Sequence, residues 1–446
     1  MKNTTKSIIS VLIALAGLVL LEVGIRILGV EPPSREEWSA QYGVYTVERY
    51  FAQAPAHFEQ KDGQCSTARQ MTWPADPTAS AMQSQTFACA PKKNRVVLLG
   101  GSSVQGYGVA EEHTTAAQLA TILSEEWDVV NAGVAGYNSL QIRRMLSEIW
   151  TLNPSLLVLY SGHNDFVFYP MIEQALSMST TQLRLRSWLD SSALWRWMRQ
   201  NFHPLAQVQV AQRERPSFDE QARAAFNQHP LPVPNDEEEL VRVLEAQQNA
   251  LQNIQTFYRE NVQAIIEEAK TRNVQVLLVV PVSRLDAPPV DGIHWKRLTT
   301  TELQRWNELW AEMEPSPPKW DDSMWQELLS LDDSYAPALY LAGQQAWQSE
   351  QKEAAIRLWS NANAYAPPSR SVVMPSSFGD WIVETGGQAS VPVLDLRPIW
   401  KEVAAEQNLP AGDLFLDSVH FNESASALFG ELIAQFIDKH SEQFRD

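Results

Sequence analysis

The strongest constraint on the fold is a repeated order of buried strand, polar loop and amphipathic helix. Apolar runs at residues 96–99, 129–130 and 155–160 are each followed within a few residues by a loop that contains glycine and polar side chains. Stretches with helical periodicity, about 110–125 and 139–152, lie between them. Strand–helix units with short loops join parallel strands by right-handed crossovers, so an α/β fold with a parallel sheet is predicted.

Two further strands are predicted after a long irregular stretch. Residues 274–280 follow a helix of about 238–272, and residues 391–394 form the last apolar run. Between these strands, residues 336–369 carry small and large side chains in the order of one tetratricopeptide-like helical hairpin. A single hairpin cannot bury its apolar face alone, so it is expected to dock on the rest of the domain or on a protein partner. An ordinary helical hairpin without a recognition role is the alternative.

The N-terminus predicts export. Lys2 and Lys6 precede an apolar run from residue 8 to 21, and apolar character continues to residue 30 apart from Glu22 and Arg26. About 20 apolar residues span a bilayer, so residues 1–30 are predicted to form an uncleaved signal anchor, that is, a transmembrane helix. A cleaved signal peptide and a buried soluble helix are the alternatives. Either form of export places the catalytic part outside the cytoplasm, in the periplasm of a Gram-negative source.

Charge and cysteine content limit the partners. The chain has 446 residues and a net charge of −18 without a long basic run, which excludes a typical nucleic-acid-binding surface. The proline-punctuated residues 31–91 are interpreted as a stalk and an irregular segment. They contain the two cysteines of the chain, Cys65 and Cys89, which are expected to form a disulfide in an oxidising compartment. Two buried thiols remain the alternative.

The chemistry-bearing residues follow the predicted strands. Ser102 comes directly after the first strand and a glycine pair, which is how α/β proteins present a nucleophile at the carboxyl edge of the sheet. A serine hydroxyl needs a base, and His420 is the candidate. Asp417, three residues before His420, is placed to orient the imidazole. Ser103 is the alternative nucleophile, although the spacing of four residues to Gly106 favours Ser102.

Donors for a tetrahedral oxyanion are predicted from three loops. They are the backbone N–H groups of Ser102 and Gly136 and the side-chain amide of Asn164. Ser103 and His163 are candidate pocket residues, although His163 fits a hydrogen-bonded loop histidine equally well. The remaining histidines lack the spacing of metal ligands, so neither a metal nor another cofactor is predicted.

These residues occur in four blocks that resemble the SGNH (GDSL-type) hydrolase superfamily. The blocks are Gly100-Gly101-Ser102-Ser103 through Gly106, Asn131 to Gly136, Gly162-His163-Asn164-Asp165, and Asp417-Ser418-Val419-His420. The resemblance implies a flavodoxin-like, three-layer α/β/α fold with Ser102, Gly136, Asn164, Asp417 and His420 as working residues. It covers roughly residues 95–165, 240–282 and 390–440. Residues 92–290 and 371–446 are predicted to form the hydrolase domain, and residues 291–370 a helical insertion. The usual aspartate before the serine is Gly101 here, which leaves the geometry of this loop open.

The combined interpretation is an extracytoplasmic serine ester hydrolase that forms an acyl-serine intermediate. An acylated carbohydrate or another envelope molecule is the expected substrate, because of the predicted compartment. The same triad also suits an O-acyltransferase that modifies an envelope polysaccharide, since a sugar hydroxyl can resolve an acyl-serine as water does. A non-catalytic interaction protein that uses the helical hairpin is the third hypothesis, and the complete set of catalytic residues argues against it.

Overall fold

The computed structural model describes residues 17, 21–24, 56–68, 72–73, 76–91, 93–123, 127–167, 169, 231, 234–313, 322–406 and 414–440. The chain divides into two compact units. The first comprises Met1–Pro55, Arg69–Ser80 and Pro170–Arg215, and its described strands β3 (Thr72–Trp73) and β4 (Asp76–Ser80) pair antiparallel. The second comprises Ala56–Ala68, Ala81–Tyr169 and Pro216–Asp446 and holds the central sheet.

The predicted N-terminal anchor lies almost entirely outside the described residues. Of residues 1–30, only Gly17 and residues 21–24 are described. Within the part of the chain that the structure describes, no helix combines the length and the hydrophobicity needed to cross a bilayer. The anchor therefore stays a prediction from the sequence.

The central sheet is five-stranded and parallel, as predicted. Its strands are β6 (Asn94–Gly100), β7 (Trp127–Gly133), β8 (Leu156–Tyr160), β9 (Gln275–Val280) and β10 (Val393–Asp395). Their spatial order is β10-β9-β8-β6-β7, with every neighbouring pair parallel. Read from the β7 edge, this is the 2-1-3-4-5 order of a flavodoxin-like sheet, in which ligands bind where the winding reverses beside the first strand. That first strand is β6, which leads to Ser102.

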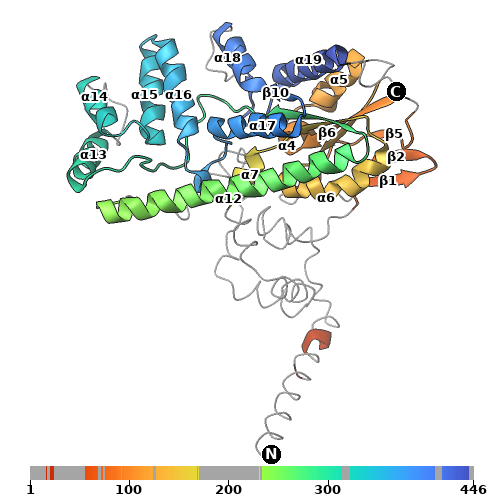
Figure 1. The fold of residues 1–446 in the computed structure, drawn as a ribbon, viewed down its shortest axis with the longest axis horizontal. Helices are drawn as coiled ribbons and strands as arrows, with labels where there is room; N and C mark the ends of the chain where they lie inside the picture. The colour runs from red at the N-terminus through yellow and green to blue at the C-terminus, as the bar shows by residue number, and fades with distance from the viewer. Residues whose placement is uncertain are drawn as a thin grey trace, which may run out of the picture. The chain divides into compact units, whose positions relative to one another are not determined.

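Helices cover both faces of this sheet, which confirms the predicted three layers (Figure 1). Alternate strand residues such as Val96, Leu98 and Val158 share one buried cluster with helices α5, α18 and α19. The opposite face carries α6, α12 and α17; on α17, Gly386 lets the helix approach Leu278 and Val393 closely. The bounds of these helices are Thr115–Leu123 (α5), Ser139–Ile149 (α6), Glu237–Lys270 (α12), Ser376–Ala389 (α17), Leu396–Glu406 (α18) and Glu423–Lys439 (α19).

Side-chain caps explain where the best-defined helices begin. Asn138 and Gln141 form a reciprocal capping box at the start of α6. Asp236 accepts a hydrogen bond from the Glu239 amide at the start of α12. Asn422 does the same for α19 and follows the predicted catalytic loop directly. Each cap satisfies an amide that the helix itself leaves without an acceptor.

Residues expected to be irregular form a small antiparallel sheet that groups with the hydrolase residues. Strands β1 (Phe58–Lys61) and β2 (Gln64–Thr67) are joined by Asp62 and Gly63, both with positive φ, and β2 pairs with β5 (Thr86–Ala88). An Asp-Gly pair between two strands is a strong hairpin signal. The expected disulfide is present: Cys65 and Cys89 are bonded, with Cα atoms 4.9 Å apart.

Between β9 and α17, the described residues form four α-helices. They are α13 (Thr300–Met313), α14 (Asp322–Leu331), α15 (Ala336–Gln348) and α16 (Lys352–Ala364). Helices α15 and α16 form a hairpin at the predicted position, where Gly343 leaves room for the Trp359 indole. The indole N–H of Trp359 donates to the Tyr340 carbonyl at 3.1 Å and ties the two helices together. A tetratricopeptide-like recognition role stays a prediction.

Candidate active site

Ser102 lies where β6 ends and the short helix α4 (Ser102–Gln105) begins. Its hydroxyl Oγ lies 2.6 Å from Nε2 of His420, which is 318 residues later in the chain. Because Ser102 is the first residue of α4, the helix supplies no acceptor for its amide. The backbone thus presents both a hydroxyl and an N–H group at the same point of the sheet edge.

His420 is held by a loop that folds back on itself just before α19. The Leu416 amide donates to the His420 carbonyl at 2.8 Å, and Phe415 and Phe421 form an isolated antiparallel bridge. Within this loop, Oδ2 of Asp417 lies 2.6 Å from Nδ1 of His420. The loop therefore holds the carboxylate and the imidazole in a fixed mutual position.

The Asp417 carboxylate is held in its ionised form. Burial raises its pKa, but the contact with the His420 ring and the amide hydrogen bonds of Val419 and His420 outweigh burial, and the pKa lies below its ordinary value. An ionised carboxylate accepts a proton-bearing Nδ1, which leaves Nε2 of His420 to accept the Ser102 O–H. The arrangement can therefore take a proton from Ser102 as its oxygen attacks a carbonyl carbon.

Ser103 is engaged elsewhere. Its side chain is buried, and its Oγ donates to the Val419 carbonyl at 3.0 Å. Expected as a possible pocket residue, Ser103 instead ties the serine loop to the histidine loop.

The Tyr107 ring covers the His420 ring, with centroids 4.5 Å apart, and limits the directions in which the imidazole can move.

The Asn164 side chain lies between the loops that carry the other two predicted oxyanion donors. Asn164 Nδ2 donates to the Tyr137 carbonyl at 2.8 Å, which places the amide beside the turn that contains Gly136. The same nitrogen lies 2.5 Å from the position that a Cβ on Gly101 would occupy, next to Ser102. Gly136 has φ 78, and the turn around it is closed by the Tyr137 amide bonding to Val134. The Gly136 N–H is not used in that turn bond, so it is available to an oxyanion.

Comparison with known proteins finds one family that part of this chain resembles. Residues 98–314 match the GDSL-like Lipase/Acylhydrolase family. This part of the chain is similar to GDSL-type hydrolases. The matched residues contain Ser102, Gly136 and Asn164 and end before Asp417 and His420, which the structure itself brings to Ser102. Together they make the protein a serine ester hydrolase. No curated protein matches the chain.

Solved structures with a similar fold are distant. An acetyl xylan esterase is 11% identical, covers 77% of this chain and 99% of its own, and has a TM-score of 0.35. A psychrotrophic esterase from Pseudoalteromonas sp. is 12% identical over 78% and 100%, with a TM-score of 0.33. A GDSL-like lipase from Bacteroides thetaiotaomicron is 13% identical over 78% and 90%, with a TM-score of 0.32. At these values, the site of this hydrolase must be argued from its own contacts.

The glycine at position 101, where the family usually has aspartate, has a steric reason in this hydrolase. Its φ of −88 suits any residue, so conformational freedom does not require glycine there. Any Cβ, however, would lie 2.5 Å from Asn164 Nδ2 and 3.3 Å from the Tyr137 carbonyl oxygen. Gly101 thus allows the Asn164 amide to lie directly against the serine loop.

Gly101→Ala is expected to lower kcat because the new methyl group displaces the Asn164 amide from the oxyanion position. Weakening one such donor costs up to ~10²-fold in turnover, and KM should change little. Steady-state kinetics on a short-chain aryl ester measure both. Gly387→Ala is the matched control, because a Cβ at this helical glycine meets no atom within 4 Å. Equal kcat values for the two variants would contradict the steric explanation.

Asp165 joins the asparagine loop to the glycine loop behind the donors. Its carboxylate accepts hydrogen bonds from the Ser139 hydroxyl at 2.5 Å and from the Ser139 amide at 3.3 Å. Burial raises the pKa of Asp165 to about 7 despite these bonds. Asp165 directly follows Asn164, and its side chain binds the first residue of α6, the helix after Gly136. It therefore holds two of the donor loops in position.

His57, which the sequence did not mark as a functional residue, supports the glycine loop. His57 Nε2 lies 2.8 Å from the Tyr137 hydroxyl, and His57 Nδ1 lies 2.7 Å from Glu148. Burial raises the pKa of Glu148, but its bonds to His57 and to the Phe58 amide hold it below the ordinary value. This Glu148–His57–Tyr137 chain holds the side chain that follows Gly136. His57 is 80 residues from Tyr137 and 91 from Glu148, so no local motif reveals these contacts.

His163 is a hydrogen-bonded loop histidine. Its Nδ1 accepts the Met374 amide at 3.0 Å, so the proton is on Nε2, which donates to the Val282 carbonyl at 3.1 Å. Burial lowers its pKa to about 4. The neutral ring joins three loops directly beside Asn164.

The neutral state of His163 predicts acid lability. An unfolded chain takes up a proton on this histidine near pH 6.5, whereas the folded protein does so only near pH 4. The unfolded state therefore binds more protons in this window, and folding stability falls as the pH drops from about 6.5 to about 4. His163→Gln should show a smaller loss of Tm across this range than the wild type, as measured by calorimetry. His113→Gln, at a half-exposed position, should keep the wild-type slope; parallel slopes for all three proteins would contradict the assignment.

Proposed function

We propose that this serine ester hydrolase acts outside the cytoplasm and removes small acyl groups from an acylated carbohydrate or a related envelope molecule. The observation that carries the chemistry is the continuous Ser102–His420–Asp417 chain, with both contacts at 2.6 Å. The Cys65–Cys89 disulfide supports an oxidising compartment. The lysines and the apolar run within residues 1–30 support an N-terminal membrane anchor.

The proposed reaction has two halves. In the first, His420 Nε2 accepts the proton of Ser102 as Oγ attacks the ester carbonyl carbon. The negative charge on the carbonyl oxygen is then stabilised by the Ser102 and Gly136 amides and by the Asn164 side chain. His420 returns the proton to the leaving alcohol, and the acyl group remains on Ser102. In the second half, His420 activates water, which attacks the acyl-serine and releases the acid.

If a hydroxyl compound other than water accepts the acyl group from Ser102, the same enzyme acts as an O-acyltransferase. Incubating the full chain with an acetyl ester and a sugar acceptor separates the two activities: free acetate indicates hydrolysis, and acetylated sugar indicates transfer. We expect acetate to be the main product.

Covalent labelling tests the nucleophile independently of the substrate. A short alkyl phosphonate with an aryl leaving group should modify Ser102, because its hydroxyl contacts His420 Nε2. Peptide mass spectrometry locates the adduct. The Ser102→Ala protein should remain unlabelled, whereas Ser103→Ala should still react. An adduct on Ser103 in the wild type would overturn the proposed mechanism.

A further inference from the structure

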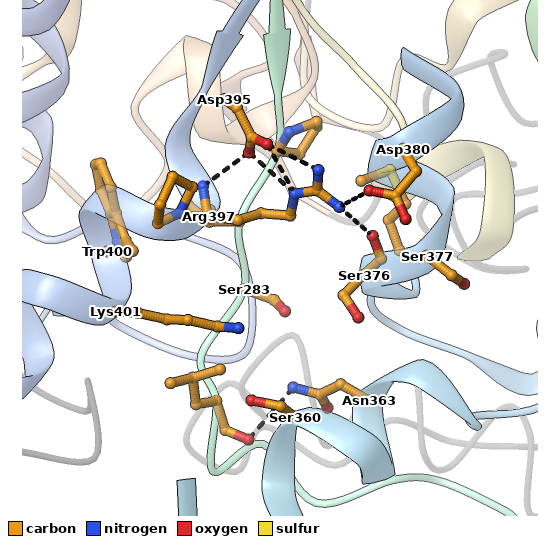
Figure 2. Close-up of a pocket in the computed structure, with 15 residues that line it drawn as sticks. Ser283, Ser360, Asn363, Ser376, Ser377, Asp380, Asp395, Arg397, Trp400 and Lys401 are labelled. Carbon is orange, nitrogen blue, oxygen red and sulfur yellow. Dashed lines mark hydrogen bonds and ion pairs between the residues drawn. The ribbon is translucent and has the colours of Figure 1, made fainter. Parts of the chain in front are cut away.

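A cavity of about 560 Å³ lies at the carboxyl ends of β9 and β10. Ligand sites in proteins commonly have volumes of ~300–1,000 Å³. Its walls come from the loop after β9 and from helices α16, α17 and α18, as Figure 2 shows. None of Ser102, Asn164, Asp417 and His420 lines it. We propose that this cavity binds a neutral carbohydrate, which goes beyond the ester hydrolysis proposed above.

The lining has a high density of groups that both donate and accept hydrogen bonds. Four serines and one asparagine contribute to the lining; they are Ser283, Ser360, Ser376, Ser377 and Asn363. A serine hydroxyl can donate one hydrogen bond and accept two. A ligand that carries many hydroxyl groups matches such a lining, whereas an acyl chain does not.

Two residues of the lining each have a buried polar atom that makes no hydrogen bond. Among the described residues, neither Ser360 Oγ nor the Trp400 indole nitrogen has a hydrogen-bond partner. Trp400 is only 4% exposed, so its N–H is shielded from bulk solvent. Buried polar atoms without partners are rare because each costs ~1–3 kcal/mol. Both belong to residues of this cavity but are closed off from it in this structure, so a ligand hydroxyl reaches Ser360 Oγ only after its side chain turns toward the cavity.

The charges of the cavity are internally balanced. Arg397 binds both oxygens of Asp395 and also contacts Asp380 at 2.7 Å, as the dashed lines in Figure 2 mark. Lys401 is the second cation of the lining, so two cations face two carboxylates. Because Arg397 is committed to carboxylates, it is not available to a phosphate or a sulfate. The balance favours a neutral ligand.

Apolar surface completes the match to a sugar. The lining includes Trp400, Pro281 and Met374 beside the hydroxyls. Trp400 packs against Phe421 with ring centroids 5.4 Å apart, which fixes the indole in place. Trp400 is only 4% exposed, so these residues offer the cavity a small apolar edge, which suits the C–H groups of a pyranose beside its hydroxyls.

The cavity also adjoins both catalytic loops. Val282 and Met374, two lining residues, bond to opposite nitrogens of His163, the neighbour of Asn164. On the other side, Phe421 packs on Trp400 and directly follows His420. The Arg284 amide, next to Ser283, donates to the Ser418 carbonyl at 2.9 Å. A sugar held here is therefore bound against the loops that carry the catalytic groups.

Calorimetric titration of the full-length Ser102→Ala protein in detergent tests this inference without turnover. The probes are cellobiose and N,N′-diacetylchitobiose as neutral sugars, and digalacturonate as an anionic one. We expect at least one neutral probe to bind, and Ser360→Leu to weaken its binding at least tenfold. Ser377→Leu, at an exposed position on the opposite wall, should have the same effect without disturbing the core. Asn361→Leu, exposed on the same helix as Ser360 and outside the lining, is the control.

Three outcomes would overturn the proposal. They are no binding of either neutral probe, binding of digalacturonate alone, and neutral binding that neither Ser360→Leu nor Ser377→Leu weakens. Circular dichroism and Tm verify that each variant is folded. Hydrolysis of a short-chain aryl ester by the wild type is measured separately, so loss of the carbohydrate inference leaves the proposed esterase activity standing, and the reverse also holds.

Discussion

Ser102→Ala is expected to lower kcat/KM for a short-chain aryl ester by about 10⁴- to 10⁶-fold. The substitution removes the nucleophile, so no acyl-serine can form. The three donors around Asn164 remain and retain a small part of the rate enhancement. Steady-state hydrolysis of p-nitrophenyl acetate measures the loss, and a burst of p-nitrophenol in the wild type should be absent from the variant.

The double variant Ser102→Ala/His420→Ala should be no slower than Ser102→Ala alone, because the two residues act as one unit. Ser103→Ala is the informative neighbour: it removes one neutral hydrogen bond to Val419, at 3.0 Å, and should cost at most about 10-fold. A loss at Ser103 as large as that at Ser102 would refute the assignment of the nucleophile.

The second large effect is expected at Asn164. Asn164→Ala removes the side-chain donor from the oxyanion position and should lower kcat by about 10²- to 10³-fold, with little change in KM. The split between kcat and KM follows because the donor acts on charge that develops only in the transition state. Kinetics with a series of aryl acetates measure both parameters.

A purely structural role for Asn164 would have a different signature. Its bond to the Tyr137 carbonyl, at 2.8 Å, also steadies the glycine loop. Tyr137→Phe leaves that carbonyl in place and removes only the hydroxyl that contacts His57. If Asn164→Ala and Tyr137→Phe lower kcat equally, loop disorder rather than a lost donor explains the effect.

The parallel sheet and the convergence of the four loops could be predicted because each signal is local. A buried apolar run followed by glycine and a polar residue marks a strand end, and parallel strands bring their carboxyl ends to one edge. Ser102 and Asn164 follow two such strands, β6 and β8, and the three-residue spacing of Asp417 and His420 fits a single loop. Family resemblance then assigned the roles.

The supporting contacts depend on pairs that only the tertiary fold brings together. The hairpin at Asp62 and Gly63 had a local signal, which the prolines around it concealed. The pairing of His57 with Glu148 across 91 residues had none, and neither did the cavity, to which α16 contributes Ser360. The fit of Gly101 against Asn164 likewise becomes visible only with coordinates.

The position of His57 also determines where a shortened recombinant protein can begin. The family match starts at residue 98, inside β6, so a cut there would remove part of that strand, whereas a version cut at residue 92 would keep β6 and the catalytic residues. It would lose the imidazole behind Tyr137 together with the disulfide-linked sheet that carries it. Such a protein would keep all five strands of the central sheet, but the glycine loop would lack the contact of Tyr137 with His57. A version that begins before residue 56 keeps that support. Comparing the stability and the kcat of the two versions shows whether the removed residues are needed for folding or only for catalysis.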